Sequence, residues 1–539
     1  MSLSLLSRYA FFAACVLFTL ASLPFSQHEW LWPFTLTAGV LSLIGLFDLL
    51  QQRHAVRRNY PILGNIRYLV EAIRPEIRQY LLESDSDALP FSRAQRSLVY
   101  ARAKNEASDK PFGTLIDVYQ SGFEFIGHSM RPAPLADPAS FRIIIGGPQC
   151  SQPYSASIFN ISAMSFGSLS ANAIRALNQG AKLGNFHHDT GEGSISPYHR
   201  EHGGDLVWEL GSGYFGCRTA DGRFDPERFA AQARSPQVRM IEVKMSQGAK
   251  PGHGGILPKH KVTEEIAETR GVLMGEDCIS PSRHSAFSTP IEMMQFIAQL
   301  RELSGGKPVG FKFCLGHPWE FMGIAKAMLE TGILPDFIVV DGKEGGTGAA
   351  PVEFTDHIGV PLREGLLFVH NTLVGLNLRD KIKLGASGKI VSAFDIASVL
   401  AIGADWANSA RGFMFAIGCI QSQSCHTNKC PTGVATQDPL RQRALVVPDK
   451  AQRVLNFHHN TLRALAEMLA AAGLEHPAQL EAKHLVRRIS ATEIKLFSQM
   501  HVFLKPGELL TGEVDGQFYS RMWQLAWADS FEPHSEVAA

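Results

Sequence analysis

Three closely spaced cysteines are the strongest chemical signal in this sequence. Cys419, Cys425 and Cys430 follow one another as C-x5-C-x4-C, with a proline directly after the last. A structural zinc site usually takes four ligands, and disulfides need cysteines in pairs. Three thiolates suit an iron–sulfur cluster that lacks one iron. Zinc held by the three thiolates and His426 is an alternative, and three buried thiols are the plainest interpretation.

Lysines at the ends of apolar segments form a second group of candidates. Lys244 ends "IEVK" and Lys312 lies in "GFKFC". A lysine inside an apolar strand costs free energy of desolvation unless it meets an anion, and a reduced flavin is one such anion. Lys250, in "QGAKPGHGG", fits either this role or that of a surface lysine.

One carboxylate stands in a glycine-rich loop. Glu192, in "TGEG", is a candidate for acid–base chemistry or for substrate contact. The histidines around it match no standard metal-binding spacing, and we interpret them as polar loop residues. They are His187, His188, His199 and His202.

Two late segments indicate a phosphate site. "GASGKI" (Gly385–Ile390) and "NSARGFM" (Asn408–Met414) follow the last two predicted strands, and Lys389 and Arg411 would add positive charge. Ordinary tight turns are the alternative. The glycine-rich "DGKEGGTGAAP" follows another predicted strand and suggests a flexible loop or lid. No GxGxxG motif follows any predicted strand, so a site for a nicotinamide dinucleotide is not evident.

The elements that must position these residues alternate between strand and helix from about Phe159 onward. Short β-branched runs precede glycine-rich loops and amphipathic helices, which predicts parallel strands. Their number over roughly 300 residues predicts a (β/α)8 barrel, with a doubly wound sheet as the alternative. The predicted strands begin at "IFNISAM", "MIEVKMS", "VGFKFCL", "DFIVVDG", "IKLGASG" and "DWANSA".

The N-terminus is apolar in two uncharged runs, Tyr9–Gln27 and Trp30–Phe47. Each is near the roughly 20 residues that span a bilayer. Arginines flank the pair, at Arg8 and after the second run, so we expect a two-span hairpin in the inner (cytoplasmic) membrane, with the catalytic domain in the cytoplasm. A signal peptide that ends near Pro24 is the alternative.

Composition and domain order complete the outline. Lys+Arg and Asp+Glu number 51 each, so no global charge points to nucleic acid, and the eight cysteines form no disulfide framework. A helix is expected to begin at Ser92 as its N-cap. We expect a membrane hairpin over 1–55, a helical region with a linker over 56–150, the barrel over 151–480 and a C-terminal extension over 481–539.

Several stretches together resemble a known family. "SAMSFGSLS", "TGEG", "IEVKMSQGAKPGHGG", "DGKEGGTGAAP" and "GCIQSQSCHTNKCPTGVATQDPLRQR" resemble, in order and spacing, the FMN-binding synthase domain of glutamate synthase. "NYPILGNIRYLVEAIRPEIRQYLLESD" is similar to the short membrane-anchored members of that family. The resemblance implies a (β/α)8 barrel with FMN, and a 3Fe–4S cluster on the three cysteines that passes electrons to it. It also implies reduction of 2-iminoglutarate, formed from 2-oxoglutarate and ammonia, to L-glutamate.

The resemblance assigns residues to this site. Glu192, Lys250 and Arg270 fall where the family contacts 2-oxoglutarate. Ile256 stands where the family has glutamine, and His253 where it has glutamate. The residues expected to hold FMN are Ala163, Met164, Ser165, Lys244, Lys312, Gly346, Thr347, Gly388, Lys389, Ser409, Arg411 and Gly412.

Three functions remain open at this point. The first is a glutamate-synthase-type enzyme that uses free ammonia or a partner's ammonia, since we expect no glutaminase domain. The second is a flavin and iron–sulfur oxidoreductase for a different amino or imino acid, which Ile256 favours. The third is a redox relay subunit of a membrane complex. Each requires a separate electron donor, either a ferredoxin or a subunit that oxidises NAD(P)H.

Overall fold

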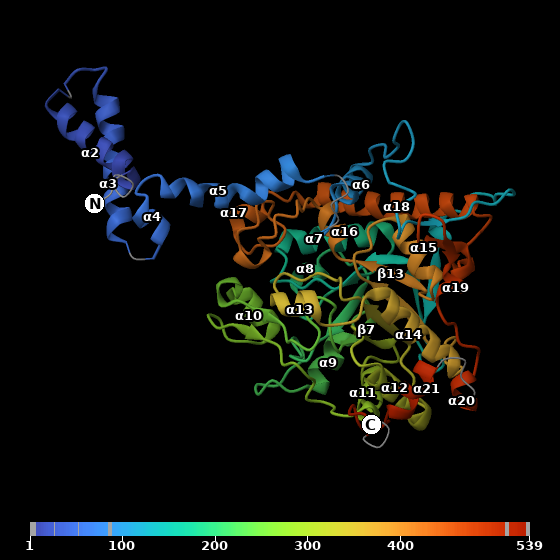
Figure 1. Ribbon diagram of the computed structural model, residues 1–539. Helices are drawn as coiled ribbons and strands as arrows, with labels where there is room; N and C mark the ends of the chain where they lie inside the picture. The colour runs from blue at the N-terminus through green and yellow to red at the C-terminus, as the bar shows by residue number, and fades with distance from the viewer. Residues whose placement is uncertain (1–6, 26, 52, 85–88, 513–516, 535–539) are drawn as a thin grey trace. The chain divides into compact units, whose positions relative to one another are not determined.

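The computed structural model describes residues 7–534, apart from residues 26, 52, 85–88 and 513–516. The outermost residues of the expected hairpin and of the C-terminal extension therefore lie outside the described residues. The chain separates into two compact units, Met1–Asp87 and Ala88–Ala539 (Figure 1). This division falls inside the region 56–150 that the sequence predicted as one segment.

The first unit contains two apolar helices, α2 (Ala10–Ser22) and α3 (Trp32–Leu50). They are joined by a hydrogen bond that Thr35 Oγ1 donates to Ser22 Oγ at 2.9 Å. Within the described residues, α3 has the length and apolar composition needed to cross a membrane, whereas the apolar segment Ala10–Phe25 is shorter than a full span. The two-span hairpin stays a prediction.

Two further helices complete the first unit, α4 (Ala55–Asn59) and α5 (Gly64–Ile77), and α5 runs into a π-helical turn at Arg78–Leu82. Asp48, near the end of α3, is buried and accepts a hydrogen bond from the backbone N–H of Ile62 at 3.0 Å. This contact fixes the turn that leads into α5, because the buried carboxylate needs a donor there.

The second unit is built on a closed barrel of eight parallel strands, which confirms the predicted (β/α)8 fold. Around the barrel the order is β4, β5, β6, β7, β10, β11, β12 and β13, and β13 pairs with β4 to close it. The strands are β4 (Phe159–Ile161), β5 (His188–Asp189), β6 (Leu206–Leu210), β7 (Val238–Lys244), β10 (Val309–Phe313), β11 (Phe337–Asp341), β12 (Lys383–Ser387) and β13 (Trp406–Ser409).

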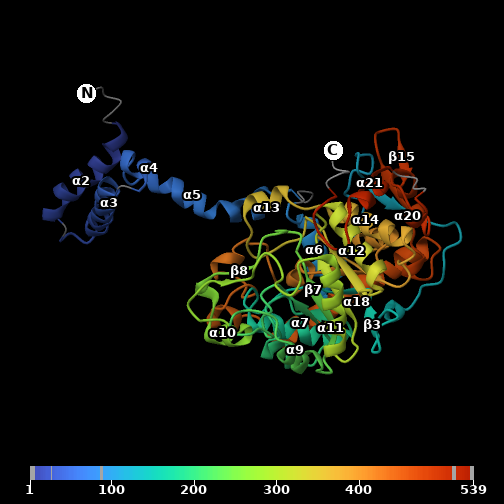
Figure 2. The same ribbon diagram turned by 90° about the horizontal axis from the view of Figure 1, so that it is seen from below.

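Helices surround these strands (Figures 1 and 2). They include α7 (Ala171–Gly184), α9 (Pro226–Ala233), α11 (Pro290–Leu303), α12 (Pro318–Thr331), α14 (Leu362–Gly375), α15 (Ala393–Ala401), α16 (Arg411–Ala416) and α18 (Val447–Ala471). Their starts follow local capping chemistry. Ser170 accepts a hydrogen bond from the N–H of Ala173 at the start of α7, and Thr289 accepts one from the N–H of Glu292 at the start of α11. Each helix thus begins where a loop leaves the barrel.

Segments before and after the barrel pack together against it. Helix α6 (Arg93–Lys104) begins after Ser92, which forms a capping box with Gln95, and so confirms the predicted N-cap. It packs on α16 and α18. Strand β1 (Glu124–Ile126) pairs with β14 (Leu485–Arg488), which in turn pairs with β15 (Ile494–Leu496). The predicted linker and the C-terminal extension are therefore joined in one small antiparallel sheet.

The remaining elements are short and lie on loops or at the C-terminus. Between barrel strands they are α8 (Pro197–Arg200), β8 (Ile256–Leu257), α10 (Glu264–Arg270), β9 (Cys278–Ile279) and α13 (Val352–His357). Before and after the barrel they are β2 (Arg142–Ile145), β3 (Tyr154–Ser157), α17 (Pro439–Gln442), α19 (Phe497–Met500), α20 (Glu508–Thr511) and α21 (Gln517–Leu525).

Candidate functional site

A cavity at the carboxyl ends of the barrel strands brings most of the predicted residues together. Of the predicted residues, those that line it are Ala163, Met164, Ser165, Glu192, Lys244, Lys250, Arg270, Lys312, Gly346, Thr347, Gly388, Lys389, Ser409, Arg411 and Cys425. They come from β10, from the last residues of β7 and β13, and from the loops after β4, β5, β7, β11, β12 and β13. Gly412, Cys419 and Cys430 lie outside this lining. The carboxyl end of the strands is where (β/α)8 enzymes carry their active sites.

Glu192 is held by close packing of two loops. Gly191, with φ +63°, precedes it, and a Cβ there would come within 2.7 Å of the backbone nitrogen of Ser165. Glu192 Oε2 lies 3.3 Å from Lys244 Nζ and accepts a hydrogen bond from Ser280 Oγ at 3.2 Å. Burial would raise the pKa of Glu192, but the neighbouring cations, Lys244 first, outweigh it and lower the pKa. Glu192 is therefore a carboxylate at neutral pH.

Two cations stand beside this carboxylate. Arg270 is buried at the end of α10, where it donates from Nη2 to the carbonyl oxygen of Phe166 at 2.9 Å. Its guanidinium lies over the ring of Phe215, 5.3 Å from the ring centre. Lys250 is buried rather than on the surface, so the surface interpretation of this lysine is wrong. Burial lowers the pKa of Lys250, although the Glu192 carboxylate opposes the shift.

The loops after β11, β12 and β13 also contribute to the lining of the cavity. Arg411 lies close to the glycine loop, since a Cβ on Gly346 would come within 2.7 Å of Arg411 Nη2. Ser409 Oγ donates to the carbonyl oxygen of Ile390 at 2.5 Å. Lys389 has a left-handed backbone, with φ +50°. Two cations and small residues thus line the same cavity, and the phosphate site stays a prediction.

The three cysteines line a smaller neighbouring cavity. The two cavities share Arg411, Met414, Cys425 and Ala435 in their walls. Burial would raise the pKa of the Cys430 thiol, but backbone N–H groups, first that of Ala435, outweigh it and lower the pKa. A lowered pKa favours the thiolate, the form that binds a metal, whereas burial raises the pKa of Cys419 to about 11.

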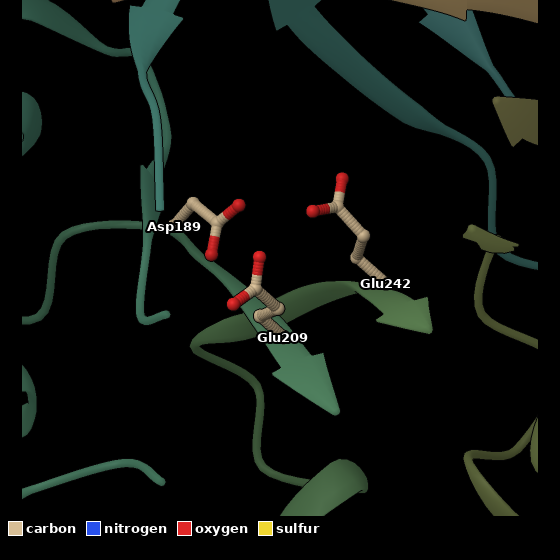
Figure 3. A group of neighbouring side chains, drawn as sticks. All are labelled: Asp189, Glu209 and Glu242. Atoms are coloured by element: carbon tan, nitrogen blue, oxygen red, sulfur yellow. The ribbon is translucent and has the colours of Figure 1, made fainter. Parts of the chain in front are cut away.

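The lysines in the strands meet carboxylates that the sequence analysis missed. Lys312 Nζ lies 3.0 Å from Glu209 Oε2, and Lys244 Nζ lies 3.9 Å from Glu209 Oε1. Asp189, Glu209 and Glu242 point toward one another from neighbouring strands (Figure 3). Lys312 in an apolar strand could have indicated these carboxylates, because a buried cation needs an anion of the protein whether or not a ligand is bound.

The histidine prediction needs correction. His187, His188 and His199 are buried, so they are not polar loop residues, although His202 is partly exposed. His188 is one of the two residues of β5, and burial lowers its pKa to about 3. These side chains are neutral parts of the barrel core. They were misread because β5 is too short to show a strand pattern.

Comparison with known proteins gives the family. The model for the conserved region in glutamate synthase matches residues 142–475. Glutamate synthase large subunit-like protein YerD of Bacillus subtilis (strain 168) is 37% identical over 495 residues, which cover 84% of this chain and 94% of that protein. An archaeal-type glutamate synthase (NADPH) of Thermotoga neapolitana is 34% identical over 313 residues. In that case the match covers 58% of each protein, so the chain spans little more than half of this relative.

Among solved structures, a mutant flavocytochrome b2 with pyruvate bound matches with a TM-score of 0.40 and 12% identity, over 84% of this chain and 91% of that one.

A (β/α)8 barrel with a charged cavity at the carboxyl ends of its strands defines the general class, a barrel enzyme. Within that class, the chain belongs to the glutamate synthase family, whose members are oxidoreductases that act on CH–NH2 groups.

Proposed function

We propose that this protein is a membrane-anchored FMN and iron–sulfur oxidoreductase of the glutamate synthase type. It reduces an imino acid, formed from a 2-oxo acid and ammonia, to an amino acid, with 2-oxoglutarate and L-glutamate as the pair by which the family is named. The observation that supports it best is that Glu192, Lys250 and Arg270 line the same cavity as Lys389 and Arg411.

The residues present fit FMN. Gly388, with φ +153°, and Lys389, with φ +50°, turn the chain sharply after β12, which leaves backbone N–H groups near the cations Lys389 and Arg411. A phosphate needs such donors and positive charge. Ala163, Met164 and Ser165 line the same cavity after β4. When bound, FMN would supply the hydride for the reduction.

The cysteine loop fits a cluster with three thiolate ligands. Cys419, Cys425 and Cys430 surround one small cavity, and Cys425 also reaches the main cavity. A 3Fe–4S cluster matches this donor count, because one iron fewer than in a cubane needs one thiolate fewer. The shared wall supports a short route for electrons between the two cofactors.

The remaining residues act on the substrate. Lys250 and Arg270 bind its carboxylate, for which guanidinium geometry is well suited. Glu192, as a carboxylate, accepts a hydrogen bond from the substrate nitrogen and exchanges a proton with it. Lys244 keeps Glu192 ionised and oriented at 3.3 Å. The loop after β11, which carries Gly346 and Thr347, helps to exclude water.

Location and partners follow from the rest of the chain. Helix α3 supports a membrane anchor, and the arginines after it favour a cytoplasmic barrel. Electrons come from a separate donor, a ferredoxin or an NAD(P)H-oxidising subunit, and ammonia is free or supplied by a partner.

A different amino or imino acid is the second candidate. Ile256 lines the cavity and is 45% exposed, so it offers an apolar surface to the substrate. A dicarboxylate gains no binding free energy from contact with an apolar side chain. A substrate with an apolar side chain would cover this surface.

One experiment separates these functions from a redox relay. The full-length protein is purified and analysed for flavin, iron and sulfide, then photoreduced without oxygen and mixed with ammonia and a panel of 2-oxo acids. Amine formation from 2-oxoglutarate supports the first function, and amine formation from another acid supports the second. Flavin and iron with no amine from any acid favour the relay. Zinc without flavin would overturn all three.

A further inference from the structure

Four charged side chains meet inside the barrel, and two of them, Glu209 and Lys312, also line the cavity. Asp189, Glu209 and Glu242 each place a carboxylate oxygen within 4.8 Å of the others (Figure 3). Lys312 extends from β10 to Glu209. All four side chains are at least 95% buried. A buried charge is costly unless it is paired, so the balance of charge in this group decides which members are ionised.

The register of the strands sets like charges side by side. Glu209 pairs in register with Glu242 on the neighbouring strand, and Lys244 pairs in register with Lys312. Glu209 lies between the two lysines, at 3.0 Å from Lys312 and 3.9 Å from Lys244. Lys244 is also the partner of Glu192 at the cavity wall. These contacts form a continuous row from the barrel interior to the cavity.

The row leaves two carboxyl groups without a cation of their own. As a carboxylate, Glu242 would have a buried Oε1 with no hydrogen-bond donor among the described residues. Carboxylate oxygens of Asp189 and Glu242 lie within 4.8 Å of each other in this buried setting, where two adjacent negative charges repel and a proton on one of them is favoured. The other charged group that faces Lys312 is Asp341, a further anion. The Lys312 ammonium already supplies the positive charge that a metal ion would bring to these acids. The arrangement therefore suits a shared proton better than a metal ion.

We propose that Asp189 and Glu242 store a proton at neutral pH and that Lys312, Glu209 and Lys244 connect this store to Glu192. The destination of the proton rests on the proposed function. Reduction of a neutral C=N bond adds a hydride at carbon and one proton at nitrogen. The hydride comes from the flavin of the proposed function. Lys244 passes a proton through the Glu192 carboxylate to the substrate nitrogen, and Lys312 restores Lys244 through the Glu209 carboxylate. The acid pair then restores Lys312, ends with one proton fewer and regains it from solvent.

Infrared spectroscopy of the purified full-length protein tests the store without turnover. Near neutral pH the protein should show a carboxylic acid C=O band that shifts in heavy water. Glu242→Gln, which has the shape of the protonated acid, and Asp189→Asn should each reduce the band. Glu302→Gln, an exposed residue on α11, is the matched control and should leave it unchanged. A band that is absent, or equal in all variants, would overturn the proposal.

The supply of protons is tested with the protein photoreduced and mixed with ammonia and the 2-oxo acid. Glu242→Gln should lower kcat by roughly a hundredfold, leave KM within about twofold and increase the solvent isotope effect on the reductive step, because proton delivery then limits the rate. An unchanged kcat with the band lost would overturn the connection to Glu192. If the wild-type protein forms no amine from any acid, the proposed function fails, whereas the infrared result still decides whether the pair stores a proton.

Discussion

Arg411 donates a hydrogen bond from Nη2 to the carbonyl oxygen of Thr347 at 2.7 Å. The bond ties the glycine loop after β11 to the start of α16 after β13. One side chain thereby positions a loop at the cavity and offers positive charge to a ligand inside it. Loss of this side chain should therefore affect both loop order and phosphate binding.

Arg411→Ala should weaken FMN binding to the protein from which flavin has been removed. The loss of a charged hydrogen-bond donor corresponds to about 2 kcal/mol, or roughly thirtyfold in Kd. Fluorescence titration with FMN measures this, and the exposed Arg443→Ala serves as control. Equal affinities for the three proteins would show that the phosphate lies elsewhere.

Cys425→Ser should remove iron and sulfide while the fold persists. Turnover driven by the electron donor should stop, but reduction of an imino acid by chemically reduced protein should continue, because that step needs no cluster. Metal analysis and the two assays check this, with Cys150→Ser, a cysteine outside the loop, as the comparison. Full donor-driven rates in Cys425→Ser would mean that electrons bypass these cysteines.

Lys250→Ala should raise KM for the 2-oxo acid and leave flavin reduction intact. Loss of a partly desolvated cation from a carboxylate corresponds to roughly 1.5 to 3 kcal/mol, or about 10- to 150-fold. Steady-state kinetics measure it, and Lys259→Ala is an exposed control nearby. If neither Lys250→Ala nor Arg270→Ala changes the kinetics of any substrate, the pocket is assigned wrongly.

In Glu242→Gln, the free energy of unfolding should decrease less with rising pH than it does in the wild-type protein. Burial raises the pKa of Glu242, and burial also raises the pKa of Asp189. An acid with a raised pKa in the folded state stabilises the fold fully below its unfolded pKa, near about 4, and this contribution falls as pH rises toward the folded value. Each retained proton corresponds to about 1.4 kcal/mol per pH unit over that window.

Glutamine cannot ionise, so the free energy of unfolding of the variant should fall less steeply than that of the wild type from about pH 4 through neutrality. Urea unfolding at a series of pH values measures both curves, with Glu302→Gln as reference. Parallel curves for wild type and Glu242→Gln would contradict a raised pKa at this residue.

A reporter enzyme fused after the C-terminus should behave as cytoplasmic, because the expected hairpin returns the chain to the side on which it begins. Membrane fractionation should place the fusion with the inner membrane. A periplasmic reporter signal, or cleavage of the chain near Pro24, would argue instead for a single span or a signal peptide.

Much of the barrel was predictable because its strands are short apolar runs followed by glycine-rich loops. The segments that contain β4, β7, β10, β11, β12 and β13 were identified from this pattern. Strand β5 was missed because it has two residues, His188 and Asp189, both polar. Strand β6 was missed because Glu209 interrupts its apolar run. The ion pair with Lys312 offsets the cost of burying the Glu209 carboxylate in the core.

The candidate site was predictable where a residue follows a strand, since parallel strands bring their carboxyl ends to one face. Glu192, Lys389 and Arg411 meet for this reason. The acids inside the barrel were not predictable in the same way. Whether Glu242 is paired depends on which residue the neighbouring strand places beside it, and register is a property of the assembled barrel.

Residues that precede the barrel in the sequence hold the cysteine loop in place through hydrogen bonds. Tyr100 on α6 donates its hydroxyl hydrogen to the carbonyl oxygen of Cys419 at 2.7 Å, and Gln421 Nε2 donates to the carbonyl oxygen of Phe91 at 3.1 Å. Both supports precede residue 142, where the match to the family begins. An excised fragment of residues 142–475 would keep all three cysteines but lose these two hydrogen bonds. The smallest portion of this chain able to hold its cysteine loop in place should therefore start at or before Phe91.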